Sequence, residues 1–364
     1  MLSFVYDALP GRVVFGAGSL ERLPDEVARL EAARVLLVST PGHRHLAEDA
    51  AERLGDRAVG IWDRARAHVP IENAEAARAE ARRVGADACV VVGGGTPIGL
   101  AKAIAVELGL PIVAVPTTYA GSEMTPVLGI TEGGVKRTRR DLRVLPRTVI
   151  YDPELTFGLP AAVSGPSGIN AIAHCVEALY ARDGNPVTSL LAEEGIRALA
   201  SSLPVVVREP EHAEARSEAL YGAWLAGSAL AAVGMALHHK LCHTLGGSFD
   251  LPHAEVHTIV LPHATAYNRA GAPAAMARIA RALDAEDAAA GLFDLAAALG
   301  AKLRLADLGL RESDLDRTAD LAVASPYPNP SPITREGIRA LLDDAFRGRR
   351  PSTETRRSAG AARS

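Results

Sequence analysis

Short apolar runs alternate with amphipathic stretches along the first part of this chain. From the N-terminus to about residue 150, β-branched runs are separated by segments rich in Ala, Arg and Glu, which predicts βαβ units on a parallel sheet. Helical periodicity over residues 72–84 and 98–108, with Pro70 and Pro97 near the expected starts, places helices between the strands. The predicted strands span residues 35–39, 88–92, 112–116 and 148–151.

The pattern changes after residue 153. β-branched runs become rare, and helices are expected at residues 167–180, 186–201, 212–243 and 252–267, with several shorter ones. We therefore predict an α/β N-terminal domain over residues 1–158, with a mainly parallel nucleotide-binding sheet, followed by an all-α C-terminal domain over residues 159–346. Residues 347–364 have the polar, basic and small-residue composition of a disordered tail.

The size and charge of the chain support this division and restrict the ligand. A chain of 364 residues, of which 48% are hydrophobic, is long enough for two domains with separate cores. The net charge of −4 and the scattered basic residues argue against nucleic acid or an anionic membrane as partner, so a small ligand is expected. Five basic residues among the eight of 136–143 are interpreted as a solvated hairpin or loop, of which one or two could face an anionic ligand.

The sequence is expected to belong to a cytoplasmic protein without a signal peptide. The opening MLSFVYDALPG lacks a basic start and a long apolar core. The uncharged stretch 219–237 is rich in Ala and Gly and ends in His-His-Lys, which favours a buried helix over a membrane span. Cys89, Cys175 and Cys242 lie in apolar runs without CxxC spacing and are interpreted as reduced core residues.

A glycine-rich turn is the first candidate for ligand binding. Gly93, Gly94 and Gly95 follow an apolar strand and precede a helix, so backbone N–H groups could approach phosphate oxygens. The spacing is not the G-x-G-x-x-G of Rossmann folds, and such a turn can also be purely structural. A second polar turn, PTTYAGSE over residues 116–123, follows the next strand, and two such turns form a ligand crevice in open α/β sheets.

Polar residues at helical spacing form the second candidate site. Three pairs are each four residues apart, which places the members of each pair on one helix face: Asn170 and His174, His239 and His243, and His253 and His257. One histidine at such a place is usually a structural residue, whereas three such pairs favour a shared function. Imidazoles with one carboxylate could hold iron, zinc or nickel, but the carboxylate is absent here.

Several segments together resemble the iron-containing alcohol dehydrogenase superfamily, which is related in fold to dehydroquinate synthase and glycerol dehydrogenase. They are GGGTP, PTTYAGSEMTP, SGINAIAHCVEALY and HHKLCHTLGGSFDLPHAEVHTIVLPHA, and the resemblance extends over nearly the whole chain. The segments FVYDALPGRVVFGAG, YAGSE, INAIAHCVEALYA and HHKLCHTLGG are similar to the maleylacetate reductase branch. The resemblance implies an NAD(P)H-dependent reductase of aromatic-compound catabolism, commonly a homodimer, that converts the small dicarboxylate maleylacetate to 3-oxoadipate.

The resemblance also implies roles for the polar residues of the helical part. The superfamily's metal ligands, an aspartate and three histidines, fall on Asn170, His174, His239 and His253, and a further family histidine falls on His243. Because the neutral Asn170 oxygen is a weaker donor than a carboxylate, a metal should be held poorly, and we expect no metal requirement. The four histidines are then expected to polarise the substrate ketone and deliver a proton.

For the cofactor, the resemblance implies contacts in both polar turns. The residues assigned to the pyrophosphate are Gly93, Gly94, Gly95 and Thr96, and those assigned to the nicotinamide side are Thr117, Thr118, Ser122, Thr125 and Lys136. Thr40 follows the first predicted strand, where NAD-specific relatives carry an aspartate, so NADPH is not repelled and both NADH and NADPH fit. Lys136, Asn170 and Lys240 are the candidates for binding the substrate.

Two other functions stay open at this point. A metal-dependent alcohol or polyol dehydrogenase on the same fold would use Asn170 as a ligand. A non-catalytic nucleotide- or metal-sensing protein would retain the fold without the chemistry, because fold does not determine function.

Overall fold

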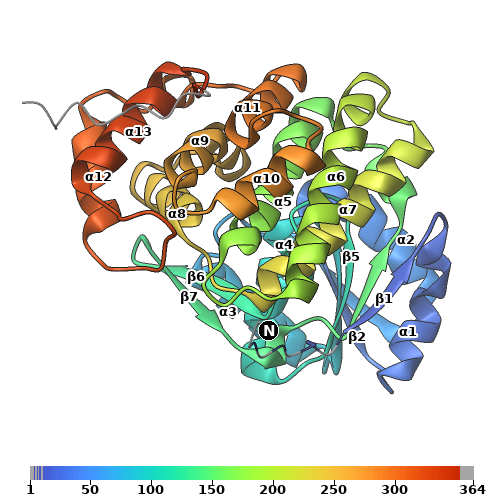
Figure 1. Cartoon of the computed structure of the whole chain (residues 1–364). Helices are drawn as coiled ribbons and strands as arrows, with labels where there is room; N and C mark the ends of the chain where they lie inside the picture. The colour runs from blue at the N-terminus through green and yellow to red at the C-terminus, as the bar shows by residue number, and fades with distance from the viewer. Residues whose placement is uncertain (1–3, 5, 7, 10, 353–364) are drawn as a thin grey trace, which may run out of the picture. The chain divides into compact units, whose positions relative to one another are not determined.

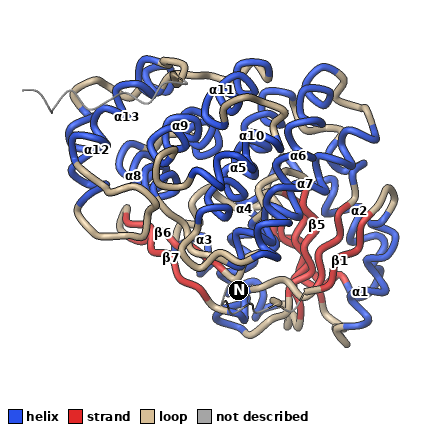
Figure 2. The backbone as a smooth tube through the Cα atoms, in the orientation of Figure 1, coloured by secondary structure: helices blue, strands red, loops and turns tan. Residues whose placement is uncertain are grey.

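The computed structural model describes residues 4, 6, 8, 9 and 11–352. The chain divides into two compact units, Met1–Met235 and Ala236–Ser364. Figure 1 follows the chain through its elements, and Figure 2 distinguishes helices from strands. The strands of the described residues all belong to the first unit, and the second unit is helical.

A six-stranded parallel sheet organises the N-terminal part of the first unit. Its strand order is β1-β8-β5-β4-β2-β3. The strands are β1 (Arg12–Phe15), β2 (Val35–Val38), β3 (Ala58–Trp62), β4 (Ala88–Gly93), β5 (Ile112–Pro116) and β8 (Thr148–Tyr151). The four central strands are buried along their whole length, which explains why their sequences are continuous apolar runs.

Helices cover the sheet. Alternate residues of the central strands, Leu37, Val90 and Val113 among them, form one apolar core with α1 (Leu23–Arg29) and α2 (Arg44–Leu54). The next two helices, α3 (Ile71–Arg83) and α4 (Gly95–Leu108), pack against each other, and α4 also packs on β4.

A separate antiparallel hairpin joins β5 to β8 along the chain. Its strands are β6 (Val127–Glu132) and β7 (Val135–Arg140), and Figure 2 shows them apart from the main sheet. Gly133 and Gly134 form the connection with φ of 56° and 76°, the left-handed conformation that a two-residue hairpin turn needs. The predicted basic hairpin or loop is therefore mostly a strand of this hairpin.

Three long helices complete the first unit. They are α5 (Ala161–Tyr180), α6 (Pro186–Arg208) and α7 (Ala213–Ala232), and each packs against the other two. Glycine allows their close approach, because a Cβ on Gly222 of α7 would lie 2.7 Å from Cγ of Leu199 on α6.

The second unit is built from six helices, all within the described residues. They are α8 (Leu237–Phe249), α9 (His253–Asn268), α10 (Pro273–Ala282), α11 (Ala288–Ala298), α12 (Asp314–Val323) and α13 (Arg335–Arg347). Apolar side chains of α8, α9, α12 and α13 share one core, in which Leu241, Val260, Leu315 and Leu342 are fully buried.

The predicted fold class is confirmed, with one helix corrected. The expected single helix over residues 212–243 is wrong: α7 ends at Ala232, Val233 is extended, and α8 begins at Leu237. The break is stabilised by the Asp183 carboxylate, whose oxygens accept hydrogen bonds from the Gly234 N–H at 3.0 Å.

The predicted domain boundary differs from the division into compact units. The last strand, β8, ends at Tyr151, close to the predicted limit at residue 158, whereas the compact units divide after Met235. The domain limits at 158 and 346 therefore stay predictions. Of the expected disordered tail, residues 353–364 lie outside the described part of the chain, and α13 ends at Arg347.

No single helix of the described residues is long and apolar enough to cross a membrane. Only α7 and α8 taken together pass that test, as a bent pair and by length and composition alone. Residues 219–232 of the expected buried helix lie in α7, where Ala219, Leu220, Ala223 and Ala226 are fully buried, and the rest falls in the break before α8.

A buried histidine of the second unit predicts how stability depends on pH. Burial lowers the pKa of His263 to about 4, against an opposing effect of Asp344. Because the unfolded chain binds the proton first, the free energy of unfolding should fall by roughly 2–3 kcal/mol between pH 7.5 and pH 4.5 through this residue. Urea unfolding of wild type and His263→Gln at both pH values measures this change in the free energy of unfolding. An equal loss of stability in the two proteins would contradict the assignment to His263.

Candidate active site

β4 ends in a backbone conformation that favours glycine. Gly93 has a φ of 137°, and a Cβ at this residue would lie 2.7 Å from Cγ of Pro97. Gly94 is extended, and α4 begins at Gly95, with Thr96 half-buried in its first turn. The N–H groups and the positive dipole end of α4 thus lie directly after the strand, an arrangement that binds anions such as phosphate.

The second polar turn lies against the first. β5 is the parallel neighbour of β4, and Pro116 pairs with Gly93. The Thr117 N–H donates a hydrogen bond to the Gly93 carbonyl at 3.3 Å, and a Cβ on Gly94 would lie 2.8 Å from Oγ1 of Thr118. Thr117 Oγ1 is buried and has no hydrogen-bond partner among the described residues. The two turns from which a ligand crevice was predicted are therefore in direct contact at the carboxyl ends of these strands.

A buried arginine holds Tyr119, the central residue of the second turn. Arg216 of α7 is fully buried and donates a hydrogen bond to the Tyr119 hydroxyl at 3.0 Å, and others to Ser164 Oγ and the Leu159 carbonyl. The Tyr119 N–H donates to Ser167 Oγ at 3.0 Å. Burial raises the pKa of Tyr119, so it stays a neutral phenol. The Tyr119 contacts fix the path of this turn.

Two further contacts fix the end of the second turn. The Tyr151 hydroxyl donates a hydrogen bond to Glu123 Oε1 at 2.8 Å, and burial raises the pKa of both groups. The turn also packs on α7 through two glycines, because a Cβ on Gly227 would lie 2.7 Å from the Gly121 carbonyl oxygen. Gly121 itself has a φ of 75°. The second turn is therefore held by the hydrogen bond between Tyr151 and Glu123 and by the close backbone packing of Gly121 on Gly227.

Thr40 lies at the same edge of the sheet. It follows β2, which is the parallel neighbour of β4, and its Oγ1 lies 2.9 Å from Nδ1 of His43. The chain runs from β2 outward to β3 and then crosses to β4 on the other side of β2, so this edge is a topological switch point. The predicted adenosine-ribose position therefore has polar atoms and no carboxylate of its own.

Asn170 and His174 lie one turn apart on α5, both nearly buried at 5% and 4% exposure. An ideal Cβ on Gly121 would lie 3.4 Å from His174 Nδ1, so this ring is beside the second turn. Asn170 Oδ1 is buried and accepts no hydrogen bond from the described residues. A buried amide oxygen without a donor is the kind of atom that a cation or a ligand N–H or O–H group would satisfy.

Five histidines of the second unit form one cluster, which we call the histidine cluster. His238, His239 and His243 come from α8, and His253 and His257 come from α9. The centroids of neighbouring rings lie 4.3 Å apart for His253 and His257, and 5.0 Å for His239 and His257. The rings of His243 and His253 are stacked at 6.4 Å. The structure therefore brings together His239, His243 and His253: the spacing predicted the pairing of His239 with His243, and the family resemblance implied that His253 joins them.

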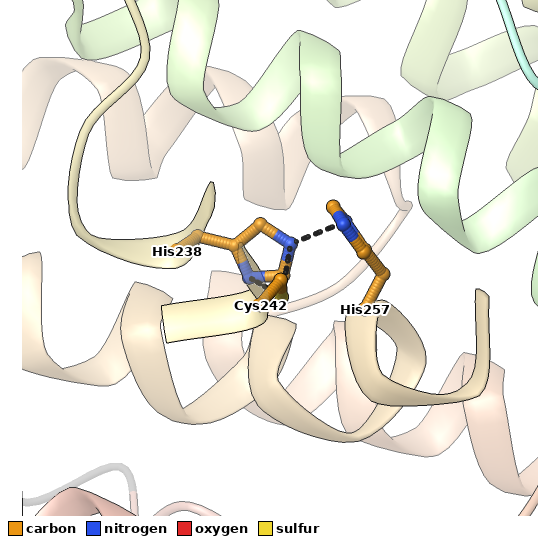
Figure 3. Close-up of side chains that lie close together, drawn as sticks. All are labelled: His238, Cys242 and His257. Atoms are coloured by element: carbon orange, nitrogen blue, oxygen red, sulfur yellow. Dashed lines mark hydrogen bonds between the residues drawn. The ribbon is translucent and has the colours of Figure 1, made fainter. Parts of the chain in front are cut away.

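The inner part of this cluster is hydrogen-bonded. Figure 3 shows His238 pointing toward His257 beside Cys242, and His238 Nε2 lies 2.9 Å from His257 Nδ1. Cys242 Sγ lies 3.6 Å from the same His238 nitrogen. All three side chains are buried, whereas His243 and His253 are exposed. Sequence reasoning missed His238, because its four-residue partner on the same helix face is Cys242, which was interpreted as a core thiol.

The remaining predicted residues take different positions. Lys240 lies on α8 next to His239, with its Nζ 5.9 Å from the ring centroid of Tyr327. Lys136 lies on β7, opposite Thr131 of β6. Thr125 is buried, and its hydroxyl donates to the Ser122 carbonyl at 3.1 Å. Ser122 and Thr125 thus stabilise the end of the second turn.

Comparison with known proteins gives a consistent picture. Residues 10–153 match the sequence model of iron-containing alcohol dehydrogenase, and residues 165–346 match that of the C-terminal part of the Fe-containing alcohol dehydrogenase family. A maleylacetate reductase of Burkholderia cepacia is 58% identical over 97% of this chain and 100% of its own length.

Solved structures agree with these matches. The crystal structure of maleylacetate reductase from Agrobacterium tumefaciens is 53% identical with a TM-score of 0.94, covering 96% of this chain and 100% of that one. An iron-containing alcohol dehydrogenase from Corynebacterium glutamicum is 46% identical with a TM-score of 0.93, covering 96% of this chain and 99% of that one.

The expectation that no metal is required is wrong. The matching family is described as iron-containing, as is the Corynebacterium glutamicum structure. The second unit also holds three buried side chains, His238, Cys242 and His257, whose donor atoms lie within 4.8 Å of one another, close enough for one metal ion. The expectation failed because it gave the weak donor Asn170 more weight than the imidazoles, which are good ligands for divalent iron. The donor chemistry of the cluster therefore fits a metal.

The glycine turn predicts a matched pair of substitutions. Gly93→Ala forces a side chain into a φ of 137° and against Pro97, which should cost about 1–3 kcal/mol of stability and weaken NADH binding by about tenfold or more. Gly95→Ala is the control for stability, because its Cβ would meet nothing closer than Ala120 Cβ at 3.8 Å. Thermal unfolding and NADH titration measure both effects. Unchanged NADH affinity in Gly93→Ala would contradict a role of this turn in cofactor binding.

Proposed function

Because this chain belongs to the iron-containing alcohol dehydrogenase family, we propose that it is an NAD(P)H-dependent reductase that converts maleylacetate to 3-oxoadipate. The observation that carries the proposal is its full-length similarity to maleylacetate reductases. The contact between the two polar turns supports the cofactor part of the proposal, and the histidine cluster supports the chemistry.

We propose that the cofactor lies along the carboxyl edge of the sheet. Its pyrophosphate is held by Gly93, Gly94, Gly95 and Thr96 at the start of α4, where N–H groups compensate phosphate charge. Its nicotinamide side contacts Thr117, Thr118, Ser122, Thr125 and Lys136. Thr40, with no carboxylate of its own, leaves both NADH and NADPH acceptable at the adenosine ribose.

The reaction adds a hydride to the carbon β to the ketone and a proton to the carbon between them, while the reduced nicotinamide becomes NAD(P)⁺. Negative charge develops on the ketone oxygen, and a preorganised hydrogen-bond donor typically lowers such a barrier by about 3–4 kcal/mol. We assign this stabilisation to His174, His239, His243 and His253. A protonated imidazole among them delivers the proton to carbon.

The family's metal has candidate donors in this chain. His239 and His253 stand at family ligand positions and lie in the histidine cluster, and the buried Asn170 oxygen stands at the position of the family's aspartate. Iron, when bound, supplies a Lewis acid that polarises a carbonyl oxygen. The neutral oxygen of Asn170 adds no charge, so the site would keep the full dipositive charge of a bound ion.

Two substrate carboxylates require cations. Lys240 follows His239 on α8, and we propose it for one carboxylate, with Lys136 for the other and Asn170 as a hydrogen-bonding group. The ring of Tyr327 beside the Lys240 ammonium supports an extended position of this side chain. We further propose a cytoplasmic homodimer without nucleic acid or membrane partners. The scattered charge supports the absence of these partners, and the buried free cysteines support the cytoplasmic location.

The test follows the oxidation of NADH by the loss of its absorbance. Purified protein should consume NADH with maleylacetate and release 3-oxoadipate, and it should reduce a simple aldehyde much more slowly. Rapid turnover of the aldehyde with added iron, without turnover of maleylacetate, would overturn the proposal in favour of an alcohol dehydrogenase.

Asn170 predicts a change in metal retention. Asn170→Asp restores a charged oxygen donor at this buried position, so iron(II) should bind about tenfold more tightly or better, measured by metal analysis after dialysis and by anaerobic calorimetry. His253→Ala should lower the bound iron, whereas His45→Ala, an exposed histidine of α2, should not. Equal iron contents in wild type, Asn170→Asp and His253→Ala would contradict these donor assignments.

A further inference from the structure

Lys102 is a charged residue within the buried, apolar stretch of a helix. It lies in α4, two turns after Gly95, and its side chain is fully buried. Its Nζ lies 2.6 Å from the Ser122 carbonyl oxygen, 2.7 Å from that of Thr125 and 3.0 Å from that of Val127. Thr125 Oγ1 is a fourth oxygen, at 3.1 Å. Every one of these acceptors belongs to the end of the second turn or the strand that follows it.

Burial of this ammonium is costly, and the oxygens around it offset the cost. Burial lowers the pKa of Lys102 to about 7, and the carboxylate of Glu123 in the same turn acts in the opposite direction. An ammonium has three N–H donors, and here each finds a carbonyl or hydroxyl oxygen. Hydrogen bonds from a charged donor are stronger than those between neutral groups. A neutral side chain of the same length would leave buried carbonyls without donors.

Lys102 joins the helix that follows the glycine turn to the end of the second turn. α4 begins at the glycine turn, and residues 122–125 close the second turn. The turns touch at their beginnings, through Gly93 and Thr117, but that contact does not reach Ser122 or Thr125. Lys102 therefore sets how far the end of the second turn lies from the helix that carries the glycine turn.

We infer that Lys102 is a positioning residue for the nicotinamide half of the cofactor, acting through the carbonyls of Ser122 and Thr125. This inference rests on the proposed function, in which the second turn contacts the nicotinamide side. Lys102 itself does not touch the cofactor in this scheme, because its N–H groups are directed to the turn. Its loss should therefore misplace the nicotinamide and leave the phosphate contacts of the glycine turn intact.

The test compares NADH with ADP, which lacks the nicotinamide half. Lys102→Met retains the chain length and removes the ammonium. The Kd for NADH should rise about tenfold or more, while the Kd for ADP should change less than about twofold. With maleylacetate, kcat should fall more than the KM for maleylacetate changes, because the hydride donor is misplaced while the substrate contacts remain.

Arg78→Met is the matched control. Arg78 is another basic side chain that donates a hydrogen bond to a carbonyl of α4, that of Ala103 at 3.0 Å, and among the described residues it has no hydrogen bond to the second turn. The Arg78→Met substitution should lower the thermal stability without changing the ratio of the Kd for NADH to the Kd for ADP. If Lys102→Met does not fold, Lys102→Gln retains two N–H donors without the charge and should shift the ratio in the same direction.

Either an equal loss of NADH and ADP affinity or no loss of either would overturn the inference. Equal losses would mean that Lys102 supports the whole sheet edge. Wild-type protein that binds NADH and shows the ratio change in Lys102→Met, yet does not reduce maleylacetate, would refute the proposed function and leave the inference standing. Reduction of maleylacetate with an unchanged ratio would refute the inference alone.

Discussion

The two polar turns of the first unit depend on the contact between the ends of β4 and β5, where the Thr117 N–H donates a hydrogen bond to the Gly93 carbonyl. Because the two strands are parallel neighbours, their turns emerge at one edge, and a Cβ on Gly94 would come within 2.8 Å of Thr118. The two turns can be in contact only if residues such as Gly94 carry no side chain at this point. Turns with so few side chains need other residues to fix their backbone. That support comes from buried charged and phenolic groups: Lys102, Arg216 and the Tyr151–Glu123 pair.

The central strands were predictable because burial on both faces produces long β-branched runs, as in β4 and β5. The two outermost strands were missed for the opposite reason: β1 and β3 are only partly buried, so their sequences lack the continuous apolar run of the central strands. The break between α7 and α8 was missed because the apolar pattern continues through it. Gly234 was the sequence feature that could have indicated the end of the helix. The hydrogen bond that stabilises the break joins it to Asp183, a residue far away in the sequence, and so could not be predicted from local pattern.

The candidate site was predictable where local spacing carries the information. Residues four apart on a helix share a face, so His239 with His243 and His253 with His257 could be paired from sequence. Contacts that cross between elements could not, and these include the hydrogen bond of His238 with His257 and the bonds of Lys102. A lysine in a helix is usually solvated, and only the apolar residues on every side of Lys102 marked it as different.

The meeting of Gly121 and Gly227 also limits how this protein can change over time. A Cβ on Gly227 would lie 2.7 Å from the Gly121 carbonyl oxygen, so no larger residue fits at position 227 of α7 unless the second turn changes its conformation. Gly121 is equally restricted by its φ of 75°. Homologous sequences can therefore vary on the exposed surface of α7. Positions 121 and 227, in contrast, can change only together, through paired substitutions.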